Sequence, residues 1–165
     1  MIFSFRSLLI SSICLVMLSC FSVADESKKY TYANSFEPKY YVVLDELDSQ
    51  IQFLDMISPA EYCGRDKMFY CVSSKQFLFA IPRFGYKNKK EWGFAGSKFL
   101  YEDERNIKIF GHTYVVSVIK SANNGIEATF LYSEERGLLG FKIQDVIEKG
   151  SKTFYLVDEV GFARR

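Results

Sequence analysis

Residues 113–133, TYVVSVIKSANNGIEATFLYS, decide the fold class because two strand-like patterns flank a tight-turn signal. The turn signal is Asn123-Asn124-Gly125, since Asn and Gly tolerate the positive φ angles that a short hairpin turn requires. After the turn, apolar and polar side chains alternate, and the apolar set is Ile126, Ala128, Phe130 and Tyr132. This alternation predicts a strand with one face in the core and the other in water.

Short strand patterns continue on both sides of this hairpin. They cover residues 40–44, 68–72, 76–81, 98–101, 107–110, 138–143 and 153–157. Turn signals recur about every 8–12 residues, as in antiparallel all-β domains. We therefore expect a mainly β protein with a minor α+β contribution, built as a small antiparallel β-sandwich or a barrel-like meander with one or two short helices.

Two short segments are expected to be helical. In SPAE, residues 58–61, the serine can cap a helix, the proline loses no needed donor, and the glutamate can reach back, so a helix is predicted from there to Gly64. Residues 145–149, closed by Gly150, predict one helical turn. Residues 48–57 fit helical and strand spacing alike, and both interpretations stay open.

The first residues of the 165-residue chain differ in composition from the rest. Apolar residues 8–18 follow a basic residue, and small residues continue to Ala24, which is the pattern of a secretory signal peptide over residues 1–24. The apolar run is shorter than the roughly 20 residues that a membrane-spanning helix needs, so no transmembrane helix is expected. We predict a polar, flexible lead at residues 25–39 and a single β-rich domain at residues 40–165.

A second interpretation of the signal region remains open. Met17-Leu18-Ser19-Cys20 resembles a bacterial lipoprotein signal, in which Cys20 would be acylated and would anchor the mature chain to a lipid surface. Met17 and Leu18 depart from the usual residues of that signal. We therefore favour cleavage after Ala24 over lipidation.

Cys63 and Cys71 are the two cysteines outside the signal region. An exported chain reaches a compartment that permits disulfides, so this pair predicts a Cys63–Cys71 bridge. The alternative is a reactive thiol, but Cys71 lies in an apolar strand pattern with no neighbouring base to activate it.

The charges of the mature chain balance. The signal peptide holds one of the 21 basic residues and none of the 20 acidic residues, so the net charge after its removal is close to zero. The strongly basic face of a general nucleic-acid binder is therefore not expected.

No pattern of a catalytic, metal or cofactor site stands out. His112, the only histidine, lies between two strand patterns and is expected to be a solvated turn residue. Ser117 and Lys120 have the Ser-x-x-Lys spacing, but residues three apart on a strand point to opposite faces. The acidic runs at residues 102–104 and 134–135 are expected to be charged turns. One histidine and two bridged cysteines cannot complete a zinc site, so we expect no metal and no cofactor.

Residues 82–97 form the longest stretch without a strand pattern, and they mix cations with aromatic rings. Such loops often contact partners, because rings offer rigid contact area and cations attract acidic surfaces. The alternative is that the rings fix the loop to the core while the lysines are merely solvated. The candidate partner-binding residues are Arg83, Tyr86, Lys87, Lys89, Lys90, Trp92 and Phe94.

The leading functional hypothesis is an exported module of the bacterial cell envelope, in the periplasm or outside the cell, that acts by protein–protein contact as an inhibitor or immunity-type protein. A second hypothesis is a lipoprotein-like envelope domain that binds an apolar ligand or lipid between its sheet and the loop. A third is an enzyme with a dispersed carboxylate or tyrosine site, which a single sequence does not reveal. The sequence leaves the oligomeric state open.

Overall fold

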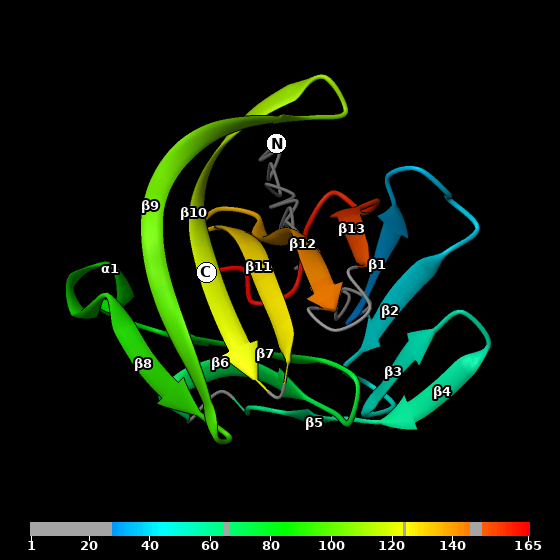
Figure 1. Cartoon of the computed structure of the whole chain (residues 1–165), viewed down its shortest axis with the longest axis horizontal. Helices are drawn as coiled ribbons and strands as arrows, with labels where there is room; N and C mark the ends of the chain where they lie inside the picture. Colours follow the sequence, from blue (N-terminus) through cyan, green and yellow to red (C-terminus); the bar gives the residue numbers. More distant parts are fainter. Residues whose placement is uncertain (1–27, 65–66, 124, 146–149) are drawn as a thin grey trace, which may run out of the picture.

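The computed structural model describes residues 28–64, 67–123, 125–145 and 150–165, and these ranges form two antiparallel sheets and one short helix. The large sheet has ten strands and the small sheet has three (Figure 1). The predicted mainly β class with an antiparallel, sandwich-like meander is therefore confirmed.

The large sheet is a meander in which most neighbours in space are also neighbours in sequence. From one edge to the other its strands are β4 (Met56–Pro59), β3 (Gln50–Phe53), β2 (Tyr41–Asp45), β1 (Lys29–Asn34), β13 (Ser151–Leu156), β12 (Gly137–Asp145), β11 (Ile126–Ser133), β10 (His112–Asn123), β9 (Ser97–Ile109) and β8 (Glu91–Phe94). The small sheet contains β5 (Glu61–Tyr62), β6 (Phe69–Ser73) and β7 (Leu78–Pro82), and helix α1 (Tyr86–Lys89) follows it.

The hairpin that decided the fold class lies inside the large sheet. Strands β10 and β11 pair in antiparallel register out to Asn123 and Ile126, as the turn signal predicts. Along β11, the rings of Phe130 and Tyr132 are buried in the core. Figure 1 shows β9 and β10 as long, bent strands, and β6 and β7 passing across the large sheet.

Aromatic rings join the two sheets. The ring centroid of Phe79 on β7 lies 5.0 Å from that of Phe130 on β11. Phe77, just before β7, lies 4.9 Å from Phe141 on β12. All four side chains are at most 4% exposed. Aromatic burial of this kind provides much of the free energy that favours folding, so the interface between the sheets is the main core.

The C-terminal segment, residues 157–165, closes one side of the core. The Leu138 amide donates to the Phe162 carbonyl at 2.7 Å, and the Tyr132 hydroxyl donates to the Ala163 carbonyl at 3.0 Å. The Phe162 ring is buried and packs edge-on against Tyr30 and Tyr62. The segment is therefore part of the fold rather than a loose tail.

The predicted disulfide is present. Cys63, just after β5, is bonded to Cys71 on β6, with 5.0 Å between the Cα atoms, and the Cys63 amide also donates to the Cys71 carbonyl. The bridge fixes the short edge strand β5, which has only two residues, to the small sheet.

We expect replacement of both cysteines, Cys63→Ala with Cys71→Ala, to lower the free energy of unfolding by about 2.5 kcal/mol, because the unfolded chain loses its loop restraint. Urea denaturation of the variant and of the oxidised wild type measures this difference. Equal unfolding midpoints in the two proteins would show that the bridge adds nothing to stability.

Several local predictions were wrong. Residues 29–34 were expected in a flexible lead, yet they form β1, which pairs with β2 and β13 and buries Tyr32 completely. The helix predicted at residues 58–61 is extended, because β4 runs to Pro59 and β5 begins at Glu61. The run at residues 102–104 is not a turn, since β9 continues through it, whereas Glu134 and Glu135 do lie in the turn between β11 and β12.

Other expectations fall beyond the described ranges. The signal peptide, Cys20 and residues 146–149 of the predicted helical turn lie outside them, and Asp145 ends β12. Among the helices that the structure describes, none has the length and apolar character needed to cross a membrane.

Candidate functional site

Residues 82–97 are largely ordered into short elements rather than one irregular loop. Gly85 has a φ of 70° and precedes α1, and Lys90, with a φ of 58°, ends it. Strand β8 then pairs with β9 through a turn at Ala95 and Gly96, both of which have positive φ. A two-residue turn with two positive φ angles matches the twist of a hairpin.

The aromatic side chains of this segment point mostly inward. Trp92 is 7% exposed, its Nε1 donates to the Ala80 carbonyl at 2.9 Å, and its ring stacks on Phe99. Phe94 is half-buried, with its ring 5.4 Å from that of Phe69. These rings therefore fix the segment to the core.

Tyr86 is also part of the core. Its side chain is 1% exposed, and its hydroxyl shares a 3.0 Å hydrogen bond with the Ser117 hydroxyl and donates to the Glu134 carboxylate at 3.2 Å. Burial raises the pKa of the Tyr86 phenol, since the phenolate would lose its hydration. The phenol is therefore a neutral structural anchor at physiological pH.

The cations of the segment divide into two groups. Arg83 lies 4.0 Å above the Tyr70 ring and donates to the Lys67 carbonyl, so it is held against the small sheet. Lys87 is hydrogen-bonded to Glu104, which raises the pKa of the Lys87 ammonium. Lys89 and Lys90 are exposed, and neither forms an ion pair with a described residue.

Two exposed apolar residues lie in or next to the same region. Phe84 is 84% exposed and Met68 is 77% exposed. The Arg83 amide donates to the Met68 carbonyl at 2.9 Å, so the backbones of Met68 and of the residue before Phe84 are adjacent at one end of the β6–β7 pair. The Lys89 amide donates to the carbonyl of Gly85, the residue after Phe84. We call Met68, Phe84, Lys89 and Lys90 the outward face.

The sequence candidates included Lys89 and Lys90. Phe84 lies in the same candidate segment but was not among the residues selected as partner-binding, and Met68 was not considered as one. Met68 had been placed in a strand pattern, whereas it lies just before β6. Phe84 comes directly before Gly85, whose positive φ turns the chain at this point. The glycine was therefore the signal in the sequence that the Phe84 ring lies on a turn.

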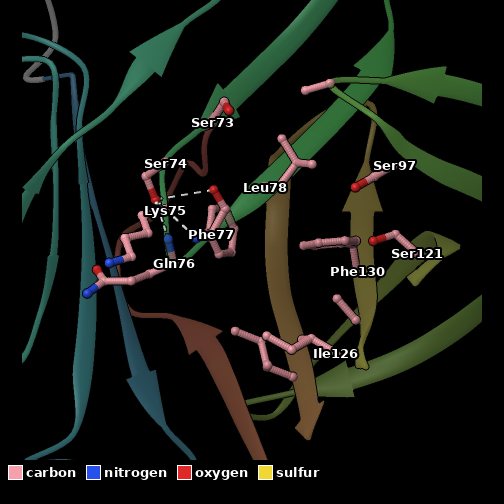
Figure 2. Close-up of a pocket in the computed structure, with 13 residues that line it drawn as sticks. Ser73, Ser74, Lys75, Gln76, Phe77, Leu78, Ser97, Ser121, Ile126 and Phe130 are labelled. Atoms are coloured by element: carbon pink, nitrogen blue, oxygen red, sulfur yellow. Dashed lines mark hydrogen bonds between the residues drawn. The ribbon is translucent and has the colours of Figure 1, made fainter. Parts of the chain in front are cut away.

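A separate cavity lies between the small sheet and the large sheet. Its volume is about 250 Å³, and Figure 2 shows the β6–β7 turn on one side and strands of the large sheet on the other. The lining residues are Ser73, Ser74, Lys75, Gln76, Phe77, Leu78, Ala95, Ser97, Ser121, Ile126, Ala128, Phe130 and Ile143.

Ser97 is the unusual residue of this cavity. The turn at residues 95–96 places it at the first position of β9, where it is 4% exposed. Its hydroxyl is buried, and it is the one such side-chain oxygen in the described ranges without a hydrogen-bond partner. By contrast, the Ser74 hydroxyl across the cavity accepts from the Gln76 and Phe77 amides.

The remaining sequence candidates are not brought together. His112 is exposed as expected, but it begins strand β10 rather than lying in the turn, which Phe110 and Gly111 form; its ring lies 6.4 Å from that of Tyr114. Ser117 is buried on one face of β10, whereas Lys120 is exposed and bonded to Glu102, so the Ser-x-x-Lys pair points to opposite faces as predicted. Among the described residues, no three His, Cys, Asp or Glu side chains are grouped as metal ligands.

Comparison of the chain with protein-family models, with curated proteins and with solved structures found no match in any of the three.

Proposed function

We propose that this protein is an exported binding module that contacts a protein partner in the cell envelope through the outward face. The observation that carries the proposal is the exposure of Met68 and Phe84 in a region whose backbone is tied by the Arg83–Met68 hydrogen bond. Large apolar side chains exposed on a rigid support are typical of contact sites, because covering them with a partner removes apolar surface from water and lowers the free energy.

The charges beside the pair suggest the chemistry of the partner. Lys89 and Lys90 follow Phe84 by five and six residues, at the other end of α1, and form no ion pair with described residues. Exposed cations of this kind speed encounter with an acidic surface and orient it. We therefore propose a partner with an apolar recess for the Phe84 ring and carboxylates around that recess.

The support of the outward face favours a preformed site. Arg83 is stacked on Tyr70, Trp92 is anchored to Ala80, and the small sheet carries the Cys63–Cys71 bridge. A rigid face loses little conformational entropy on binding. The disulfide agrees with the export that the signal sequence predicts.

Affinity capture from the native envelope, with the oxidised mature domain as bait, tests the proposal. We expect Phe84→Ser with Lys89→Glu and Lys90→Glu to lose the partner that the wild type retains. A contact of this type contributes about 2 kcal/mol, so its loss weakens binding by roughly 30-fold. Trp92 is unsuitable as a test position because its removal would damage the core.

The matched control carries the same changes elsewhere on the surface: Phe36→Ser with Lys108→Glu and Lys142→Glu. Phe36 is 87% exposed, and both lysines are exposed. The control is expected to capture the partner as the wild type does. Capture that survives the outward-face changes, or that is lost equally in the control, would contradict the proposal.

A further inference from the structure

The cavity between the sheets offers a binding site that is separate from the outward face. Its apolar lining comes from three regions far apart in sequence: the β6–β7 turn, the β8–β9 turn and the β10–β12 ends. Phe77 and Phe130 are buried, whereas Ile126 is 47% exposed. The cavity thus mixes buried rings with polar side chains and has a partly open border.

The Ser97 hydroxyl gives the interior a polar point. A buried hydroxyl without a partner costs free energy, and folded proteins rarely retain one without a reason. Figure 2 shows Ser97 and Ser121 on the same side of the cavity, opposite the β6–β7 turn. The Ser97 hydroxyl, unpaired among the described residues, could donate a hydrogen bond to an oxygen acceptor on a ligand.

The lining also limits the charge of a ligand. Among the described residues of the lining, Lys75 is the one charged residue and none is a carboxylate. A cationic ligand would therefore lose its hydration without gaining an ion pair from these residues. A neutral ligand has no charge to desolvate, and an anionic group can pair with Lys75.

The size of the cavity limits the ligand as well. Its volume of about 250 Å³ lies just below the roughly 300–1,000 Å³ of pockets for drug-sized molecules. A compact molecule with a short apolar body fits this volume.

We propose that this cavity binds a small neutral or anionic amphiphile whose apolar body lies against Phe77 and Phe130 and whose oxygen acceptor takes a hydrogen bond from Ser97. This site does not depend on the protein contact proposed above. Medium-chain acyl compounds have the required chemistry, and octanoate and 1-octanol serve as the anionic and the neutral probe.

Titration of the mature protein with each probe, followed by calorimetry and by the NMR shifts of the Ile126 and Ile143 methyl groups, tests the site. We expect saturable shifts of both methyl groups with at least one probe. Ser97→Ala is expected to weaken the binding affinity of that probe by about 2- to 13-fold, which is the range for loss of one hydrogen bond. Ala128→Leu fills the cavity and is expected to abolish the shifts.

Thermal unfolding separates a ligand role from a structural role of Ser97. Without ligand, Ser97→Ala is expected to melt at or above the wild-type temperature, because it removes an unsatisfied hydroxyl. The control Ser117→Ala removes a buried hydroxyl that is bonded to Tyr86, so it is expected to melt lower and to keep the probe affinity.

Two results would overturn the proposal: no methyl shifts with either probe at millimolar concentration, or unchanged probe affinity in Ser97→Ala. The partner capture of Ser97→Ala should equal that of the wild type, because Ser97 lies outside the outward face. Failure of the ligand site and failure of the protein contact are therefore distinguishable.

Discussion

Phe130→Ala is expected to lower the free energy of unfolding by about 3–5 kcal/mol. The Phe130 side chain is 1% exposed, and its ring centroid lies 5.0 Å from that of Phe79 and 6.0 Å from that of Phe77. The Phe130 ring therefore packs β11 of the large sheet against β7 and against Phe77, which precedes β7. Truncation removes these contacts and leaves a cavity that the two rigid sheets cannot close.

Urea denaturation with the disulfide intact measures this effect. Phe36→Ala is the matched control, because the same ring is removed from a side chain that is 87% exposed. The control is expected to stay within about 0.5 kcal/mol of the wild type. A loss below about 1 kcal/mol for Phe130→Ala would show that the two sheets do not share one tightly packed core.

Gly161→Ala is expected to cost about 3 kcal/mol, because the C-terminal segment approaches β12 too closely for any side chain. A Cβ atom at Gly161 would lie 2.1 Å from the Leu138 carbonyl oxygen and 2.9 Å from its carbonyl carbon. Both are backbone atoms of a paired strand and cannot turn aside. The segment would have to move away and withdraw Phe162 from its place beside Tyr30 and Phe79.

Hydrogen exchange adds a local test of this prediction. The Leu138 amide donates to the Phe162 carbonyl, so its exchange should become faster in Gly161→Ala even where the rest of the sheet stays protected. Gly150→Ala is the control, since a Cβ there meets nothing within 4 Å. Unchanged unfolding and unchanged Leu138 exchange in Gly161→Ala would refute the described position of the segment.

Local patterns in the sequence predicted the features that depend on neighbours along the chain. The hairpin at Asn123 and Ile126 and the bridge between Cys63 and Cys71 belong to this group. Strand β1 lies between β2, which follows it in sequence, and the distant β13, where Tyr32 pairs with Leu156. The polar character of residues 25–39 concealed this strand, and its pairing with β13 could not be seen from the local sequence.

Strand β9 shows a second reason for error. Its acidic stretch has the composition of a turn, yet cations in the structure balance it. Lys120 on the neighbouring strand β10 is bonded to Glu102, and Arg105, two residues further along β9 itself, forms a bidentate contact with Asp103. Composition alone does not show the cross-strand pair, because it depends on register.

The candidate sites were only partly predictable. The mixture of rings and cations at residues 82–97 indicated a surface segment, but it did not show which rings face inward. Trp92 and Tyr86 point into the core and Phe84 points out, and this difference follows from the turn at Gly85 and from tertiary hydrogen bonds. The cavity around Ser97 depends on three distant regions, so no sequence window contains it.

Site-specific photo-crosslinking in intact cells tests the proposed protein contact most directly. A photoreactive phenylalanine analogue would replace Phe84, and in separate strains Phe36 or Phe110, which are 87% and 70% exposed. We predict a discrete crosslinked protein adduct from position 84 and none from positions 36 and 110. No adduct at position 84, or the same adducts from all three positions, would contradict the assignment of the outward face as the partner contact.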